Sequence, residues 1–211
     1  MPVRADVALA DLTSLRLGGP AHRLVDVSTE ADLVDAVRTA DTAGEPLLVL
    51  AGGSNLVVAD GGFDGTVVHV VTRGVDVRAS DGDAATATDA DERLGAATDA
   101  GASTGTGHGT GDAQPGGRGP TVDVTVAAGE PWDTLVARAV AEGWSGIEAL
   151  SGIPGSTGAT PIQNVGAYGQ EVADTIVRLR AWDRRTGEVR TIPAADCGFG
   201  YRTSAFKGHD R

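Results

Sequence analysis

The most informative stretch of this 211-residue chain is Gly152-Ile153-Pro154-Gly155-Ser156-Thr157-Gly158-Ala159-Thr160-Pro161-Ile162-Gln163-Asn164-Val165-Gly166-Ala167-Tyr168-Gly169-Gln170-Glu171. Its first three glycines recur every third residue, and two prolines stiffen the backbone. The Rossmann fingerprint does not fit, because two residues separate the first pair of glycines and Pro161 obstructs a following helix. The pattern favours a backbone presented to a large polar ligand over a glycine loop that merely packs.

A shorter glycine segment, Ala51-Gly52-Gly53-Ser54-Asn55-Leu56, lies between two apolar runs. Adjacent glycines let the backbone turn sharply, so successive N–H groups can converge on an anion such as a pyrophosphate. The Ser and Asn side chains would add hydrogen bonds. Taken alone, however, this tetrapeptide favours a plain turn between two strands, because such residues are common in turns.

The residues before this segment predict a strand, a helix and a second strand. Residues 24–27 form a short apolar run, and Ser28 or Thr29 then caps a helix with apolar residues at helical spacing. Gly44 and the proline that follows end the helix, and the apolar run 47–50 has the length of a strand. Such units build α/β or α+β layers.

Four further elements are predicted downstream by their patterns. A strand is expected at 66–71 after a glycine turn, and a half-buried strand at 122–126, where valines alternate with polar residues. A helix is expected from Pro131 to Gly143, and a hairpin at 175–183 and 188–192. Trp132, Trp144 and Trp182 are interpreted as packing residues of these elements.

Residues 79–120 differ sharply in composition from the rest of the chain. Leu94 is their only large aliphatic residue, while Gly, Ala, Thr and Asp dominate. Such a stretch buries too little apolar area to offset the backbone entropy of ordering, about 1 to 2 kcal/mol per residue. We therefore expect a disordered surface insertion. Its glycine repeat at 105–111 resembles a nucleotide loop but lacks the flanking strand and helix, which favours a low-complexity linker.

Composition excludes several classes of function. The net charge of −12 disfavours nucleic acid or an anionic membrane as a partner, because phosphate would be repelled. The single cysteine, Cys197, and four scattered histidines suggest no metal site and no disulfide, and the cysteine is expected to be a buried apolar residue. No run reaches the roughly 18 apolar residues of a membrane helix, and no signal peptide is evident. We expect a cytoplasmic protein.

Four segments occur in a specific order: Thr13-Ser14-Leu15-Arg16-Leu17-Gly18-Gly19, residues 52–56, residues 152–171, and Phe199-Gly200-Tyr201-Arg202-Thr203-Ser204-Ala205-Phe206-Lys207. Together they resemble the UDP-N-acetylenolpyruvoylglucosamine reductase family over nearly the whole chain outside 79–120. The resemblance implies an α+β, two-subdomain FAD-binding domain of the vanillyl-alcohol-oxidase (PCMH) type with a low-complexity insertion. The first subdomain would span about 16–78, the insertion 79–120 and the second subdomain 121–211.

The resemblance also implies a set of site residues. A loop would hold the pyrophosphate of noncovalent FAD, and its residues are Gly52, Gly53, Ser54, Asn55 and Leu56. A longer segment would wrap the cofactor, and its residues are Gly152, Ile153, Pro154, Gly155, Ser156, Gly158, Gln163, Asn164, Gly166 and Ala167. Arg202 matches the catalytic arginine, whose guanidinium would engage the substrate carboxylate through two hydrogen bonds. The alternative for Arg202 is a surface salt bridge. No histidine is assigned as a general base.

By the same resemblance, NADPH would reduce the flavin, which then passes hydride to UDP-N-acetylenolpyruvoylglucosamine and yields UDP-N-acetylmuramate for peptidoglycan. The family continues beyond the arginine motif into a substrate-binding domain that carries a proton-donating serine and a late glutamate. Ser204 does not replace that serine. The chain is therefore expected to be inactive alone, and two alternatives remain: a flavin-binding fragment without reductase activity, or another FAD oxidoreductase of the same fold.

Overall fold

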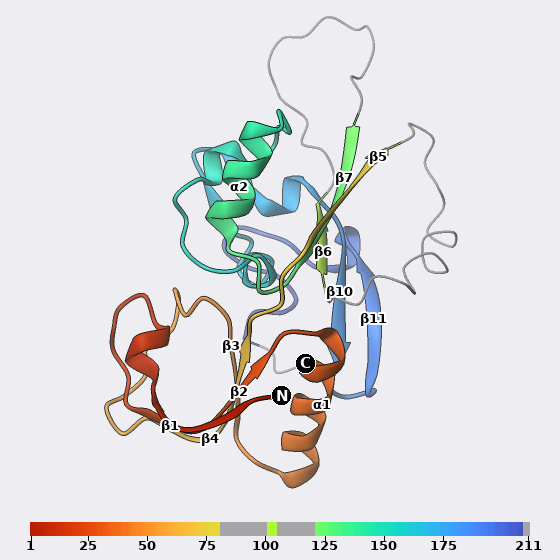
Figure 1. Ribbon diagram of the computed structural model, residues 1–211. Helices are drawn as coiled ribbons and strands as arrows, with labels where there is room; N and C mark the ends of the chain where they lie inside the picture. The colour runs from red at the N-terminus through yellow and green to blue at the C-terminus, as the bar shows by residue number, and fades with distance from the viewer. Residues whose placement is uncertain (81–100, 105–120, 209–211) are drawn as a thin grey trace, which may run out of the picture.

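The computed structural model describes residues 1–80, 101–104 and 121–208. Within these residues two larger sheets are formed, with strand orders β1-β2-β4-β3 and β11-β10-β6-β7-β5, together with a small sheet of β8 and β9. Each larger sheet lies in its own lobe and has its own long helix (Figure 1). The mixture of strands and segregated helices confirms the predicted α+β class.

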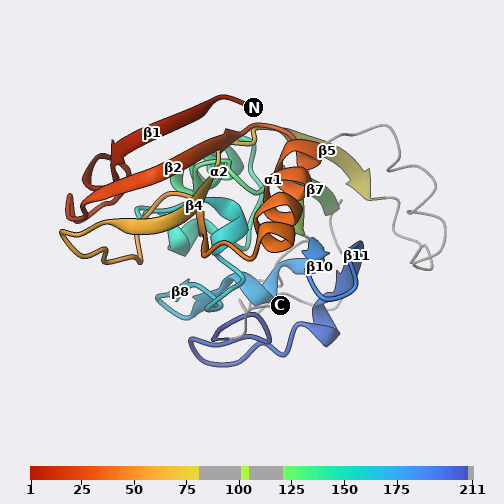
Figure 2. The same ribbon diagram turned by 90° about the horizontal axis from the view of Figure 1, so that it is seen from below.

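The first sheet contains β1 (Val3–Ala8), β2 (Pro20–Val27), β3 (Leu47–Leu50) and β4 (Phe63–Val70). Strands β2, β4 and β3 are parallel, and β1 pairs antiparallel with β2. Helix α1 (Glu30–Ala43) covers one face of this sheet (Figure 2). The parallel arrangement brings the carboxyl ends of β2, β3 and β4 to one edge, where ligands bind in open α/β sheets.

Helix α1 begins and ends as its sequence predicts. The Thr29 side chain accepts a hydrogen bond from the backbone N–H of Asp32 at 3.1 Å. Gly44 adopts a left-handed conformation with φ of 66° and closes the last turn. The helix buries Ala36 against Val25 and Val68 of the sheet. The opposite face of the sheet packs on the short helix η1 (Leu9–Leu12).

The second sheet contains β5 (Val75–Ser80), β6 (Gly101–Thr104), β7 (Thr121–Ala127), β10 (Ile176–Asp183) and β11 (Glu188–Pro193). All its pairings are antiparallel. Helix α2 (Trp132–Ala141) packs here, and Trp132 is fully buried with its indole N–H donated to the carbonyl of Leu150 at 3.1 Å. Buried Cys197 lies in the same core, as predicted.

Short elements connect α2 to the end of the chain. They are η3 (Glu148–Leu150), η4 (Thr157–Ala159), β8 (Gly166–Ala167), β9 (Gln170–Glu171), η5 (Val172–Asp174) and η6 (Ala194–Asp196). Most of the predicted ligand segment 152–171 therefore consists of turns and single helical turns. Its shape must be held by individual side-chain and backbone contacts.

Three expectations about boundaries are corrected. Strand β6 lies inside residues 79–120, which were expected to be disordered, and β5 continues to Ser80. Pairing with β7 on one side and β10 on the other satisfies the backbone of β6, which offsets the ordering entropy without large apolar residues. Strand β1 precedes residue 16, and β5, which begins at Val75, belongs to the second sheet although the first subdomain was expected to extend to residue 78. Leu94 and the glycine repeat at 105–111 lie outside the described residues.

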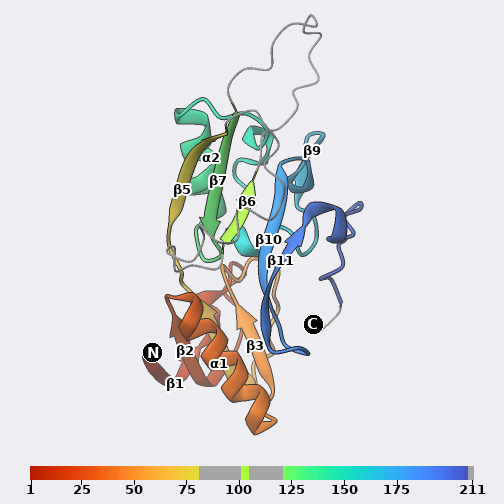
Figure 3. The same cartoon turned by 90° about the vertical axis from the view of Figure 1, so that its right-hand side faces the viewer.

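Strand β10 also joins the two lobes. Its hairpin with β11 extends alongside α1 (Figure 3). Arg180 donates two hydrogen bonds to the Glu30 carboxylate at 2.8 and 2.9 Å, and Arg184 pairs with Asp41 at the other end of the helix. The hydrogen bonds from Arg184 hold the pKa of Asp41 below its ordinary value despite partial burial.

Candidate functional site

The two predicted glycine segments lie against each other. A Cβ added to Gly52 would lie 2.8 Å from the Cα of Gly155, so only glycine permits this approach. The Ser54 hydroxyl donates to the carbonyl of Pro154 at 3.1 Å. Residues about 100 positions apart thus form one candidate site at the junction of the lobes.

The contacts continue from the glycine loop toward the arginine motif. The Asn55 side chain donates to the Gln163 amide oxygen at 3.3 Å. The neighbouring Asn164 donates to the carbonyl of Gly200 at 3.1 Å, and the Ser204 hydroxyl donates to the carbonyl of Ile162 at 2.7 Å. This row of contacts brings the Gly52 loop, the long segment and the arginine motif together.

The loop after β3 has the features of an anion site. In the described part of the chain, no hydrogen-bond acceptor contacts the backbone N–H groups of the four residues 52–55. Gly53 has φ of 58°, and its added Cβ would lie 2.0 Å from the carbonyl oxygen of Leu12. Its own carbonyl accepts from the N–H of Ser14 at 3.1 Å, so the first of the four segments, Thr13 to Gly19, also adjoins the loop. Free successive N–H groups fit a pyrophosphate.

Asn164 has a different position from the one expected of a cofactor ligand. Its side chain is buried, with 1% of the residue exposed. It donates to Glu171 at 2.7 Å and to Gly200 at 3.1 Å, and it accepts from the N–H of Ala173 at 3.1 Å. The side-chain donors and acceptor are therefore engaged within the protein, and Asn164 holds the turn that carries Arg202.

Arg202 lies on an exposed turn bridged by Gly200 and Thr203. Its φ is 53°, and its guanidinium lies 5.8 Å from the centroid of the Tyr201 ring. The Lys207 ammonium donates to the Arg202 carbonyl at 2.7 Å, which braces the turn. No carboxylate among the described residues pairs with Arg202, so the salt-bridge alternative finds no partner there.

The other predicted cofactor residues divide into exposed and packed ones. Gly158 packs on Ala128, with an added Cβ only 2.6 Å from the Ala128 Cβ, and an added Cβ on Gly166 would meet Glu171. Gly152 is open to solvent on its Cβ side, and its N–H donates to Asp133 at 2.6 Å. Four more of the predicted cofactor residues are buried or partly buried in the protein: Leu56, Ile153, Ser156 and Ala167.

Sequence patterns miss a charged trio beside this site. On the sheet face opposite α1, the Asp26 carboxylate pairs with His69 Nδ1 at 2.7 Å and with Arg4 at 2.8 Å. Burial alone would raise the pKa of Asp26, but hydrogen bonds from His69 and Arg4 outweigh it and lower the pKa. Asp26 and His69 are register partners of parallel strands, a relation that local spacing does not reveal.

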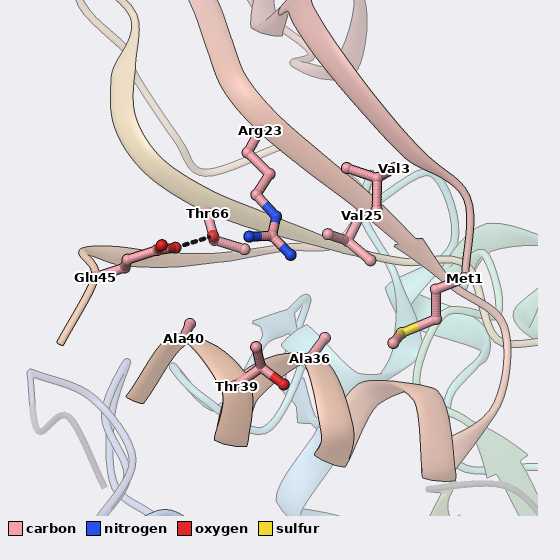
Figure 4. Close-up of a pocket in the computed structure, with 9 residues that line it drawn as sticks. All are labelled: Met1, Val3, Arg23, Val25, Ala36, Thr39, Ala40, Glu45 and Thr66. Atoms are coloured by element: carbon pink, nitrogen blue, oxygen red, sulfur yellow. Dashed lines mark hydrogen bonds between the residues drawn. The ribbon is translucent and has the colours of Figure 1, made fainter. Parts of the chain in front are cut away.

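Two cavities accompany the first lobe. One, of 470 Å³, is lined by Gly52, His69 and residues of the loop after η1. The other, of 110 Å³, lies between α1 and the sheet, where Arg23 and Met1 point into a largely apolar space and Glu45 accepts from Thr66 (Figure 4). This second cavity contains none of the predicted site residues, whereas the first contains Gly52.

Comparisons with known proteins agree with this geometry. A family model described as "FAD binding domain" matches residues 21–90 and 120–193. A UDP-N-acetylenolpyruvoylglucosamine reductase of Salinispora arenicola (strain CNS-205) is 50% identical over 98% of this chain and 47% of its own length. The reductase of Thermobifida fusca (strain YX) is 47% identical over 98% of this chain and 48% of its own length.

A solved structure is also similar. The crystal structure of UDP-N-acetylenolpyruvylglucosamine reductase from Thermus caldophilus superposes with a TM-score of 0.64 at 26% identity, covering 97% of this chain and 57% of that one. The chain thus spans about half the length of the curated relatives it matches. Within the described residues, no helix is long and apolar enough to cross a membrane, and no group of His, Cys, Asp and Glu could hold a metal ion.

Proposed function

Because the chain belongs to the FAD-binding domain family, we propose that it holds noncovalent FAD at the junction of its two lobes. The pyrophosphate would lie at the Gly52–Asn55 loop, where four backbone N–H groups have no other acceptor in the described structure. Segment 152–167 would pass along the cofactor, with Asn164 and Gly158 supporting its shape. Each sheet with its helix would form one subdomain.

The row of contacts that joins all four sequence motifs carries this proposal. It links Ser14 to Gly53, Asn55 to Gln163, and Asn164 to Gly200, which supports a single site that would include Arg202 and the Gly52 loop. A simple turn between strands would not need the close approach of Gly52 to Gly155. A cofactor site and an anion-binding arginine on one surface fit a flavoenzyme that acts on a carboxylate.

We further propose that the chain is part of an NADPH-dependent reductase that converts UDP-N-acetylenolpyruvoylglucosamine to UDP-N-acetylmuramate in the cytoplasm. FAD would supply hydride transfer. Arg202 would hold the substrate carboxylate through two hydrogen bonds and stabilise negative charge as the double bond is reduced. The absence of a carboxylate partner for Arg202 among the described residues supports this role.

Turnover would also need groups in the part of the relatives that this chain does not span, since it covers 47% of the Salinispora protein. A group that delivers the proton contributes about a hundred- to ten-thousand-fold in rate. The alternative is a flavin-binding module without reductase activity. The two differ in whether supplying the missing half gives turnover.

The first experiment is cofactor binding by residues 1–211. We expect a yellow protein, or uptake of added FAD, with release of the flavin by acid or heat. A folded, colourless chain that takes up no added FAD would contradict the proposed FAD site.

The second experiment tests Arg202 in the chain fused to the C-terminal half of the Salinispora relative. The Arg202→Lys variant should keep FAD and its reduction by NADPH, but the rate of substrate reduction should fall about a hundredfold. Lysine keeps the positive charge but cannot make the two parallel hydrogen bonds of a guanidinium. Arg185→Lys is the control, since Arg185 is an exposed side chain elsewhere. Equal slowing of both half-reactions would contradict the carboxylate role. A fusion that binds FAD but never turns over would favour the module.

A further inference from the structure

Three charged side chains from three adjacent strands form a row on the sheet face opposite α1. Arg4 of β1 donates to Asp26 of β2 at 2.9 Å, and Asp26 pairs with Nδ1 of His69 of β4 at 2.7 Å. The His69 side chain is only 17% exposed, and that of Asp26 only 22%. A carboxylate at Nδ1 orients an imidazole and leaves Nε2 for a second partner.

His69 also lines a pocket with room for a ligand. His69 lines the 470 Å³ cavity together with Ala51, Gly52 and the loop of residues 11–16. No partner for Nε2 lies among the described residues. The cavity is therefore bounded by the edge of the phosphate loop on one side and by a carboxylate-oriented histidine on another.

We propose that this cavity binds a phosphate group and that His69, oriented by Asp26, donates a hydrogen bond to it through Nε2. The proposal extends the FAD site of the proposed function to a residue outside all four motifs. It also assigns His69 a role that sequence spacing did not suggest.

The charges around the cavity fit an anion. Arg16 lines it, and Arg4 compensates the charge of Asp26. Asp11 is the one opposing carboxylate among the described lining residues. Phosphate oxygens accept hydrogen bonds, so they engage the imidazolium, in which both ring nitrogens donate.

Two sources could supply this phosphate: the pyrophosphate of a bound dinucleotide, or free inorganic pyrophosphate. The probes FAD, ADP, riboflavin and inorganic pyrophosphate separate them, because riboflavin carries no phosphate. Affinities would be measured by calorimetry on the whole chain.

His69→Gln is the test variant, and His22→Gln is its matched control. His22 also faces an aspartate, Asp6, at 3.5 Å, but its side chain is 55% exposed and lies outside the cavity. We expect His69→Gln to weaken the binding of FAD and ADP about tenfold or more and to leave the binding of riboflavin unaffected. His22→Gln should behave as the unsubstituted chain.

Asp26→Asn gives a second test if His69→Gln folds poorly, because an amide keeps the shape but not the charge. This substitution should also weaken the binding of ADP. If only the binding of inorganic pyrophosphate were weakened, the site would be assigned to the free anion. Unchanged affinities for all phosphate probes in a folded His69→Gln protein would overturn the proposal. If the unsubstituted chain bound no FAD, the proposed function would fail, while the pyrophosphate arm would still decide this site.

Discussion

Replacing Asn164 by alanine should destabilise the protein and release the turn that carries Arg202. The buried side chain makes three hydrogen bonds, to Glu171, Gly200 and the N–H of Ala173. It also occupies a left-handed conformation with φ of 46°, which asparagine tolerates better than alanine. Both effects act in the same direction.

The magnitude follows from these contacts. Each neutral hydrogen bond contributes about 0.5 to 1.5 kcal/mol, and the bond to the Glu171 carboxylate about 1.5 to 3. The left-handed backbone adds about 1 kcal/mol for alanine. Together these contributions predict a loss of about 3.5 to 7 kcal/mol, a large part of the stability of an ordinary domain.

Urea unfolding followed by tryptophan fluorescence measures this loss. Asn55→Ala is the matched control, because Asn55 makes one exposed hydrogen bond of 3.3 Å and should change the free energy of unfolding by less than about 1 kcal/mol. Asn164→Asp serves if the alanine variant does not fold. It places a second carboxylate beside Glu171, so its stability relative to the unsubstituted chain should improve as the pH falls toward 5.

The contrast between the two asparagines is the critical result. If Asn164→Ala cost no more than Asn55→Ala, the interpretation of Asn164 as the support of the Arg202 turn would be wrong. If both folded variants kept the same FAD affinity, Asn164 would support the turn without contacting the cofactor directly.

Three further outcomes are expected. Gly53→Ala should destabilise strongly and impair FAD binding, because its Cβ would lie 2.0 Å from a backbone oxygen, whereas Gly152→Ala meets no atom within 4 Å and should cost about 1 to 2 kcal/mol in urea unfolding. Asp26 has a pKa below its ordinary 3.8, so its stabilisation is complete above that pH and is lost as the pH falls below it; Asp26→Asn should flatten acid unfolding followed by circular dichroism. Arg180→Ala should lower the unfolding midpoint more than Arg190→Ala, because Arg190 is more exposed, and equal shifts would refute the coupling of lobes.

Local patterns predicted the elements that carry their own signals. The cap at Thr29, the glycine at 44 and the hairpin turn before Glu188 all lie where the sequence places them. Strand β6 could not be predicted in this way, since its stability comes from pairing with β7 and β10. Its residues carry no period of their own.

The same distinction applies to the site. The glycine segments predicted a backbone presented to a ligand, whereas the close approach of Gly52 to Gly155 was not predicted and is seen only in the fold. Their ligand roles stay predictions. The supporting role of Asn164 and the pair of Asp26 with His69 depend on tertiary neighbours and strand register, which residue spacing does not encode.

The ion pairs of Arg180 and Arg184 with α1 have a consequence for dissecting this protein. A chain cut between the lobes would not yield two independent halves, because the first half would lose the two cations that hold its helix. The carboxylates of Glu30 and Asp41 would then lack their arginine partners. Grafting the first lobe onto another protein should therefore succeed only when a hairpin equivalent to β10–β11 travels with it.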